Sequence, residues 1–367
     1  MSKKVMLVSG TRPEAIKMCP LVNELKSRQE FTTVVCTTGQ HKSMLEQVMR
    51  AFHVQADYDL SIMKQGQTLF DVTQAILEKI PPVLEKEKPD IVLVHGDTST
   101  TFTTALACFY MKIPVGHVEA GLRTGDKYSP YPEEFNRQAV GILARYNFAP
   151  TETARQNLLR EGKDPSSIYV TGNTAIDALR TTVTEHYTQE NLIWAQGSRL
   201  ILLTAHRREN LGQPMHEMFR AIRRIMDEYK DVKLIYPIHM NPQVRQIAEE
   251  ELADCDRIRL IEPLDVLDFH NFMAASYLIL TDSGGIQEEA PSLGKPVLVM
   301  RNTTERPEGI AAGTLKLVGT DEEPIYRNIK LLLDDQDAYR SMSHASNPYG
   351  DGYASVRIAD ILEKESL

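Results

Sequence analysis

Residues 5–17 read VMLVSGTRPEAIK: an apolar, β-branched run (Val5–Ser9), a polar turn that begins at Gly10, and the start of a helix. Runs of the same kind recur along the chain and alternate with longer amphipathic stretches. Short, nearly continuous apolar runs are typical of strands in a parallel sheet that helices cover on both faces. The sequence therefore predicts repeated βαβ units and a doubly wound α/β fold.

The apolar runs fall into two groups, separated by a polar helical stretch at Ile176–Ser198. The expected strands of the first group are Val5–Ser9, Thr33–Thr37, Ile91–His95, Val115–Glu119 and Ile168–Thr171. Those of the second group are Leu200–Thr204, Lys233–Ile238, Ile258–Ile261, Tyr277–Thr281, Pro296–Met300 and Leu315–Val318. This grouping predicts two domains, the number that a chain of 367 residues also favours.

The two groups begin alike, because Ser9–Glu14 reads SGTRPE and Thr204–Glu209 reads TAHRRE. Each is a strand exit followed by a polar turn, an arginine and a glutamate; chance similarity between two ordinary turns is the alternative. We predict two Rossmann-like domains that face each other across a cleft. The first spans residues 1–175 and is joined by a C-terminal helix at about 353–367, and the second spans residues 176–352. Ligands of such sheets bind beyond the carboxyl ends of the strands.

The composition is that of an ordinary globular chain, with 42% hydrophobic and 25% charged residues. A net charge of −9 argues against a nucleic-acid-binding protein, which normally carries a basic balance. No stretch is long and apolar enough for a transmembrane helix, and the run Val5–Val8 is too short for a signal-peptide core. Four scattered cysteines are typical of buried thiols in a reducing compartment. We expect a cytoplasmic protein that binds neither nucleic acid nor membrane.

Several common ligand motifs are missing from the sequence. No Gly-x-Gly-x-x-Gly follows a predicted strand, and no Gly-x-x-x-x-Gly-Lys-[Ser/Thr] occurs. The histidines form neither His-x-His nor His-Glu-x-x-His, so a metal site has no local support. We expect no dinucleotide cofactor and no metal.

Charged residues of the first half follow its strands. Arg12 and Lys17 lie near the start of a helix, where backbone N–H groups favour anions, although two solvated cations would look the same. Asp97 follows one strand and Glu119 ends the next, and Glu133 opens a later helix. Asp97 as the N-cap of the helix through Tyr110, and Glu133 as an acid favoured by the helix dipole, are the alternatives. Three carboxylates at one rim are typical of proton transfer at neutral pH.

The second half offers a complementary set of polar turns. Ser283, Gly284 and Gly285 predict a capped helix start that a diphosphate can approach, and Glu288 or Glu289 could accept hydrogen bonds from ribose hydroxyls. A capped helix with acids near its N-terminus is the alternative. The other polar residues that follow strands here are His206, Arg207, His239, Arg301 and Arg306.

Together and in this order, these clusters resemble the bacterial non-hydrolysing UDP-N-acetylglucosamine 2-epimerases. The motifs that carry the resemblance are GTRPEAIK (10–17), GQH (39–41), HGDT (95–98), GHVEAGLRT (116–124), YPEE (131–134), TGNT (171–174), HRREN (206–210), TDSGG (281–285) and TERPE (304–308). The resemblance covers the chain from end to end. It implies a glycosyltransferase-B-like fold with residues 176–352 as the UDP-binding domain, and a homodimer. It also implies inversion at C2 of UDP-GlcNAc to give UDP-ManNAc, which supplies ManNAc units for cell-surface polysaccharide.

Carried over by resemblance, Asp97, Glu119 and Glu133 are the catalytic carboxylates, and His206 lies near the leaving diphosphate. The residues that resemble the UDP-contacting set are Arg12, Lys17, Ser283, Gly284, Gly285, Glu289 and Arg306. The residues that match the pattern of a second, allosteric UDP-GlcNAc site are Gln40, His41, Gln67, Arg207 and His239. Ser43 and Gly66 stand where some relatives have a longer polar or basic side chain.

The chemistry of UDP-GlcNAc limits the mechanisms by which its C2 can be inverted. C2 of the sugar has no adjacent carbonyl, and oxidation to a ketone would need a nicotinamide site, for which the sequence has no motif. Elimination of UDP across C1–C2 to a 2-acetamidoglucal, followed by re-addition, requires an acid and a base on opposite faces of C2. A hydrolysing epimerase, a glycosyltransferase of the same fold and a UDP-sugar sensor remain as alternatives.

Overall fold

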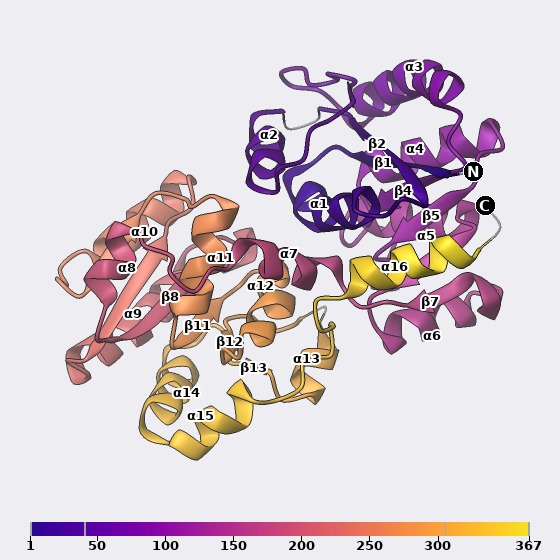
Figure 1. Ribbon diagram of the computed structural model, residues 1–367. Coiled ribbons are helices and arrows are strands. Elements are labelled where there is room, and N and C mark those ends of the chain that lie inside the picture. The colour runs from indigo at the N-terminus through magenta and orange to yellow at the C-terminus, as the bar shows by residue number, and fades with distance from the viewer. Residues whose placement is uncertain (1, 40–41, 305, 366–367) are drawn as a thin grey trace. The chain divides into compact units, whose positions relative to one another are not determined.

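The computed structural model describes residues 2–39, 42–304 and 306–365. The chain forms two compact units: Met1–Thr181 together with Tyr349–Leu367, and Thr182–Pro348. These limits lie a few residues from the expected boundaries at 175 and 353. Figure 1 shows that each unit is a sheet with helices on both of its faces.

The first unit contains a parallel sheet of seven strands among its described residues, in the order β3-β2-β1-β4-β5-β6-β7. The strands are β1 (Lys3–Ser9), β2 (Phe31–Thr37), β3 (Tyr58–Asp59), β4 (Ile91–His95), β5 (Val115–Val118), β6 (Tyr146–Ala149) and β7 (Ile168–Val170). The helices are α1 (Arg12–Lys26), α2 (Lys42–Ala51), α3 (Leu69–Glu87), α4 (Ser99–Tyr110), α5 (Glu133–Leu143), α6 (Glu152–Arg160), α7 (Thr174–Thr182) and α16 (Ala354–Lys364), with the 3₁₀ turn η1 (Pro165–Ser167).

The second unit contains a parallel sheet of six strands in its described part, in the order β10-β9-β8-β11-β12-β13. The strands are β8 (Arg199–Thr204), β9 (Val232–Pro237), β10 (Ile258–Ile261), β11 (Leu278–Thr281), β12 (Val297–Val299) and β13 (Leu315–Leu317). The helices are α8 (Glu190–Ala195), α9 (Gln213–Glu228), α10 (Pro242–Leu252), α11 (Val266–Ala275), α12 (Gly284–Glu289), α13 (Pro307–Ala311), α14 (Glu322–Asp334) and α15 (Gln336–Ser343), with the 3₁₀ turns η2 (Arg208–Asn210) and η3 (Ala290–Leu293).

Strand order reverses once in each sheet. The first strand of the first unit, β1, lies between β2 and β4, and the first strand of the second unit's sheet, β8, lies between β9 and β11. The reversal points are where open α/β sheets bind their ligands. The predicted doubly wound α/β fold of both halves is therefore confirmed.

Local sequence explains most of the elements that reach the β1–β4 reversal point. All five residues of β4 are buried, which matches its continuous apolar run. Helix α1 begins as predicted, because Thr11 and Glu14 form a capping box and Pro13 lies in the first turn. Two strands were not expected: β3 has only two residues, and β6 carries the buried polar residue Asn147.

The C-terminal helix α16 packs against α1 in the first unit (Figure 1). Lys3 in β1 donates hydrogen bonds to the carbonyl groups of Leu362 and Glu365 at its end, and Arg28 pairs with Asp360 at 2.6 Å. Cations at the carboxyl end of a helix are favoured by its dipole. These contacts therefore hold α16 in the first unit, both at its carboxyl end and along one of its faces.

All four cysteines are free and buried, as predicted. Among the residues that the structure describes, no helix combines the length and apolar character needed to cross a bilayer.

Candidate active site

Two carboxylates follow neighbouring strands of the first unit. Asp97 lies two residues after the end of β4, and Glu119 comes directly after β5, which pairs with β4 in parallel. The strand predicted to include Glu119 ends at Val118, because Glu119 has a φ of +65°, outside the range of a strand. The N-cap of α4 is Thr98, whose side chain accepts from the Thr101 N–H. The capping alternative for Asp97 is therefore wrong.

The Asp97 carboxylate is ion-paired with Arg137 of α5. Asn136, also on α5, donates to the Asp97 backbone carbonyl at 2.9 Å, so this helix holds both the side chain and the backbone of the turn. Burial raises the pKa of Asp97, the nearby charge of Glu119 raises it as well, and Arg137 opposes both. The two carboxylates thus interact electrostatically, the condition under which the pKa values of a pair separate.

The Glu119 carboxylate is surrounded by polar groups from three other segments. Lys17 of α1 forms an ion pair with Oε2, and Asn173 Nδ2 donates to the same oxygen at 3.1 Å. His95 Nε2 lies 3.7 Å from Oε2, and burial lowers the pKa of this histidine to about 4, so its ring is neutral. Lys17, predicted from the sequence as a UDP contact, is held by the carboxylate in this structure.

The third predicted carboxylate, Glu133, is the first residue of α5 and is half-buried. Among the described residues, no ion pair or hydrogen bond joins its side chain to Asp97 or Glu119. Its neighbour Glu134 is fully buried and accepts from the Thr124 N–H at 3.1 Å, which is a structural role. The structure therefore brings two of the three carboxylates together and places Glu133 on the helix that carries Arg137.

A further buried carboxylate organises the turn after β1. Glu14 is 2% exposed and accepts from the backbone N–H groups of Gly10 and Thr11 at 2.9 and 2.7 Å. Its other oxygen accepts from Thr98 Oγ1 at 2.6 Å, beside Asp97. Arg12, a predicted UDP contact, is the first residue of α1, so its position depends on this network.

In the second unit, His206 follows β8 at the reversal point. His206 Nδ1 lies 3.3 Å from Oδ1 of the fully buried Asp282, and the ring stacks on His239 with centroids 5.4 Å apart. Desolvation lowers the pKa of His206, and the Asp282 carboxylate opposes this effect. Asp282 Oδ2 also accepts from the N–H groups of His206 and Arg207, at 2.9 and 2.8 Å. One carboxylate thus holds the backbone of this turn through Oδ2 and lies beside its ring through Oδ1.

The predicted diphosphate-binding turn opens α12. A Cβ on Gly284 would lie 3.6 Å from the Arg306 guanidinium carbon, so the structure brings these two candidates together. Arg306 Nε donates to the buried Glu288 at 2.7 Å, so of the two ribose candidates only Glu289 keeps a part-exposed carboxylate. Ser283 stands at the N-cap, but its side chain makes no capping hydrogen bond, contrary to the prediction. A Cβ on Gly285 would lie 4.0 Å from Glu289 Oε1.

The candidates for an allosteric site come from both units. Gln40 and His41 lie outside the described residues, as does the side chain of Ser43. Gln67 accepts from the Lys64 N–H at 3.0 Å, and Gly66 beside it is exposed. In the second unit, Arg207 donates to the Asp282 carbonyl at 3.0 Å, next to the stacked His239. The structure therefore groups Arg207 and His239 with His206.

Sequence reasoning missed five residues that hold the site: Glu14, His95, Arg137, Asn173 and Asp282. Each contacts a residue distant in the sequence, as Glu14 contacts Thr98, so spacing gave no signal for their partners. Asp282 and His95 do lie beside predicted site residues, directly after or at the end of a strand. Reading every polar residue at a strand end as a candidate would have found these two.

Two doubly wound units with this strand order define a glycosyltransferase-B-like α/β protein. The family model described as UDP-N-acetylglucosamine 2-epimerase matches residues 23–363. UDP-N-acetylglucosamine 2-epimerases from Bacillus subtilis and Escherichia coli K12 are 62% and 51% identical, covering 98% and 99% of this chain and 94% and 99% of the relatives. The solved Neisseria meningitidis enzyme bound to UDP-GlcNAc is 47% identical, with a TM-score of 0.89, and covers 99% of this chain and 100% of that one. The chain belongs to the UDP-N-acetylglucosamine 2-epimerase family.

Proposed function

We propose that the protein interconverts UDP-GlcNAc and UDP-ManNAc in the cytoplasm by eliminating UDP across C1–C2 and adding it back to the 2-acetamidoglucal. The observation that carries this proposal is the pair Asp97 and Glu119, on adjacent strand ends and coupled electrostatically. In the elimination, one group takes the C2 proton while the C1–O bond to UDP breaks. In the addition, a proton reaches C2 from the other face and the diphosphate oxygen re-forms the bond to C1. An acid and a base with distinct surroundings suit these two steps.

The surroundings of the two carboxylates differ in the way this chemistry needs. Asp97 is ion-paired with Arg137, whereas Glu119 is ion-paired with Lys17 and accepts from the Asn173 amide. The polar groups around the two carboxylates therefore differ, although both lie at the same edge of the sheet. Glu133 is the third carboxylate of the proposal. It lies on the first turn of α5, and Arg137, one turn further along the same helix, contacts Asp97, so α5 reaches the site.

The second unit holds the nucleotide in this proposal. Gly284 and Gly285 open α12, where the first backbone N–H groups of a helix have no partner within it. Arg306 lies beside Gly284 and carries a charge that matches a diphosphate. Ser283 and Glu289 are the remaining contacts that this unit supplies, and His206 stands near the leaving group. The Neisseria meningitidis relative, solved with UDP-GlcNAc, supports UDP-GlcNAc as the ligand.

The test follows C2 by NMR during incubation with UDP-GlcNAc in D2O, with no added cofactor. The proposal predicts deuterium at C2 and accumulation of UDP-ManNAc. A folded enzyme that leaves C2 unexchanged would refute it, and free ManNAc as the main product would favour a hydrolysing epimerase. Asp97→Asn serves as the matched variant: UDP binding should persist and exchange should fall by about two orders of magnitude or more.

We also propose that UDP-GlcNAc binds a second, activating site built from Gln40, His41, Gln67, Arg207 and His239. The stacking of His239 on His206 supports this, because it links the proposed activator site to a catalytic candidate within one unit. A sigmoidal dependence of rate on UDP-GlcNAc that becomes hyperbolic in His239→Ala is the expected result. A hyperbolic wild-type curve would count against the second site.

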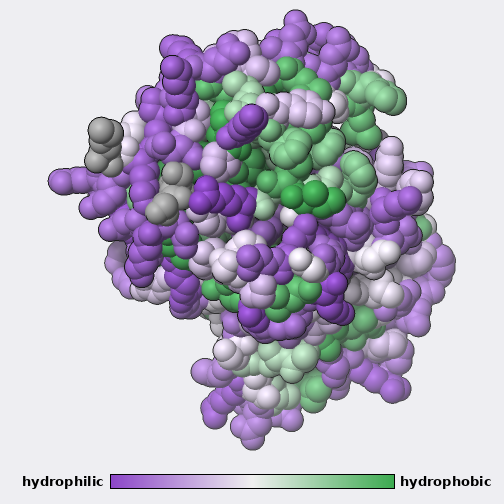
Figure 2. Space-filling view, turned by 90° about the vertical axis from the view of Figure 1, so that its right-hand side faces the viewer, coloured by the Kyte–Doolittle hydropathy of each residue, from purple (hydrophilic) through white to green (hydrophobic). Residues whose placement is uncertain are grey.

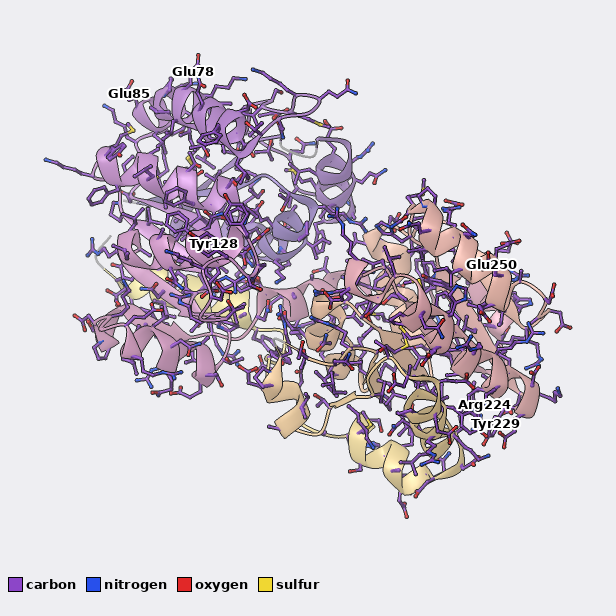
Figure 3. The ribbon with its side chains drawn as sticks, turned by 180° about the vertical axis from the view of Figure 1, so that it is seen from behind. Glu78, Glu85, Tyr128, Arg224, Tyr229 and Glu250 are labelled. Carbon is purple, nitrogen blue, oxygen red and sulfur yellow. The ribbon has the colours of Figure 1, made fainter. Side chains whose placement is uncertain are left out.

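Finally, we propose that the protein is a homodimer through an apolar face of the first unit. Exposed hydrophobic residues gather on α3, α4 and α5: Phe70 is 87% exposed, Ile142 is 74% and Tyr110 is 69%. Figure 2 shows a hydrophobic patch in the upper part of its view. Figure 3 shows Glu78 and Glu85 pointing outward from α3, and Tyr128 on the loop before α5. Patches of this kind mark association surfaces. Light scattering should give twice the mass of the 41.4 kDa chain, and Ile142→Glu should give one mass. A wild-type monomer would refute the dimer.

A further inference from the structure

We propose that Asn173 is a positioning residue that fixes the orientation in which the Glu119 carboxylate exchanges a proton with the substrate. The inference rests on the proposed catalytic role of Glu119. Asn173 lies in the loop between β7 and α7, far from Glu119 in the sequence, and is 2% exposed.

The orientation of the Asn173 amide is set by its own hydrogen bonds. Oδ1 accepts from the Ala175 N–H at 2.9 Å, so Nδ2 faces Glu119 and donates to Oε2 at 3.1 Å. The reversed amide would place an NH2 group against a backbone N–H and an oxygen against a carboxylate, and would lose both bonds. Asn173 is therefore a hydrogen-bond donor toward Glu119.

The backbone of Asn173 is also held, by the segment in which the chain returns to the first unit. The Asn173 N–H donates to the Tyr349 carbonyl at 2.8 Å. Gly172 before it has a φ of +90°, and a Cβ there would lie 3.5 Å from the Gly350 Cα. The amide thus reaches Glu119 from a closely packed support rather than from a free loop.

Asn173 is one of two donors that hold Glu119 Oε2. Lys17 Nζ and Asn173 Nδ2 both donate to Oε2, and these two donors match the two lone pairs of a carboxylate oxygen. A proton on Oε2 would displace one of them. Oε1 instead lies toward the turn that carries Asp97, 3.6 Å from the position that a Cβ on Gly96 would take. Lys17 and Asn173 therefore hold the carboxylate by Oε2, with Oε1 directed toward the turn of Asp97.

The backbone of Glu119 explains why such a clamp is needed. A φ of +65° is disfavoured for a residue with a Cβ, and residues other than glycine persist there only when their surroundings hold them. The Lys17 and Asn173 contacts supply that restraint at the end of the side chain. Loss of the amide should let the carboxylate rotate, which lowers the fraction of enzyme with the carboxylate in its reactive orientation.

The test must separate positioning from helix capping, because Asn173 directly precedes α7 and caps the Ala175 N–H. Serine and aspartate cap helices about as well as asparagine. Asn173→Ser keeps the cap and removes the amide donor, so kcat should fall at least tenfold with KM within twofold. Asn173→Asp keeps the cap and puts a second carboxylate against Glu119, so the limb of the pH–rate profile that Glu119 governs should move to higher pH.

The matched control is Asp335→Asn, the same exchange of amide and carboxylate at the exposed N-cap of α15, where Asp335 accepts from the Asp337 and Ala338 N–H groups at 2.9 and 3.0 Å. Its kinetics and pH profile should be those of the wild type. Wild-type kcat in folded Asn173→Ser, together with an unmoved profile in Asn173→Asp, would overturn the proposal.

A measurement on the wild-type protein keeps the proposal testable even where the variants do not fold, and it needs no turnover. With ¹⁵N-labelled asparagine, the Asn173 side-chain amide signal should shift with the ionisation of Glu119, and this shift should be absent in Glu119→Gln. An amide signal that does not respond would refute the contact. A responsive signal in an enzyme with no C2 exchange would instead refute the catalytic role of Glu119 and leave the contact standing.

Discussion

The ion pair between Arg137 and Asp97 should set the pH range of the enzyme. Their side chains are 12% and 26% exposed, so the pair is only weakly screened by solvent. Burial and the charge of Glu119 raise the pKa of Asp97, and Arg137 is the group that opposes them most. Arg137→Gln removes that opposition, so the pKa of Asp97 must rise further.

The size of the effect follows from the interaction that is lost. A hydrogen bond to a charged group contributes about 1.5–3 kcal/mol, and one pKa unit corresponds to about 1.36 kcal/mol. The limb of the pH–rate profile that Asp97 governs should therefore move to higher pH by about one to two units. If Asp97 acts as a base and must be ionised, the acidic limb moves. If Asp97 acts as an acid and must be protonated, the basic limb moves, and in both cases the movement is to higher pH.

The assay is kcat/KM for UDP-GlcNAc from pH 5 to pH 9, by direct detection of UDP-ManNAc, with circular dichroism at each pH as the check on folding. Arg137→Lys should move the limb less, because it keeps the charge and loses the planar fork. Arg199→Gln is the matched control: it breaks an Arg–carboxylate pair with Asp231 at the amino end of β8, in the unit that contains neither Asp97 nor Glu119. A profile of Arg137→Gln with both limbs unmoved would refute this account of Asp97.

Three further predictions concern single contacts. Gly284→Ala should not lower the melting temperature, because alanine favours the helix by about 1 kcal/mol and its Cβ would lie 3.6 Å from the Arg306 guanidinium carbon. The same change should weaken UDP binding at least tenfold by calorimetry. Unchanged affinity would exclude Gly284 from the nucleotide site. Asp282→Asn removes the charge that raises the pKa of His206, so the NMR titration midpoint of this histidine should move to lower pH, and a midpoint that stays in place would show that the two groups do not interact. Burial raises the pKa of Cys19 to about 12, so a thiol reagent should label it only as fast as the protein unfolds, and immediate labelling would contradict the structure.

The sequence predicted the fold well where strands are continuous apolar runs. Ile91–His95 and Ile258–Ile261 form strands with the predicted limits. The prediction failed at β6, because Asn147 interrupts the apolar run and its burial depends on neighbouring strands. It also placed Glu119 in β5, since the residue type carries no sign of a positive φ. Local pattern therefore identified the sheet, and tertiary contacts decided its ends.

The candidate site was predictable to the extent that it lies at strand ends. Asp97, Glu119 and His206 were singled out for that reason, and the structure places all three there. The groups that tune them could not be read in the same way. Arg137 reaches Asp97 from α5, and Asn173 reaches Glu119 from the loop before α7, so each pairing requires the folded chain.

The likeness between the two halves extends to a shared physical problem at the reversal point of each sheet. The turn after the first strand exposes backbone N–H groups that the sheet leaves without partners, and buried N–H groups need acceptors. In the first unit, Glu14 of α1 accepts from Gly10 and Thr11 at 2.9 and 2.7 Å. In the second unit, Asp282 accepts from His206 and Arg207 at 2.9 and 2.8 Å, but it comes from the turn after β11. A buried carboxylate therefore holds both turns, but it comes from a different position of the chain in each unit. The aligned sequences SGTRPE and TAHRRE show that the turns are alike, but they do not show this shared contact.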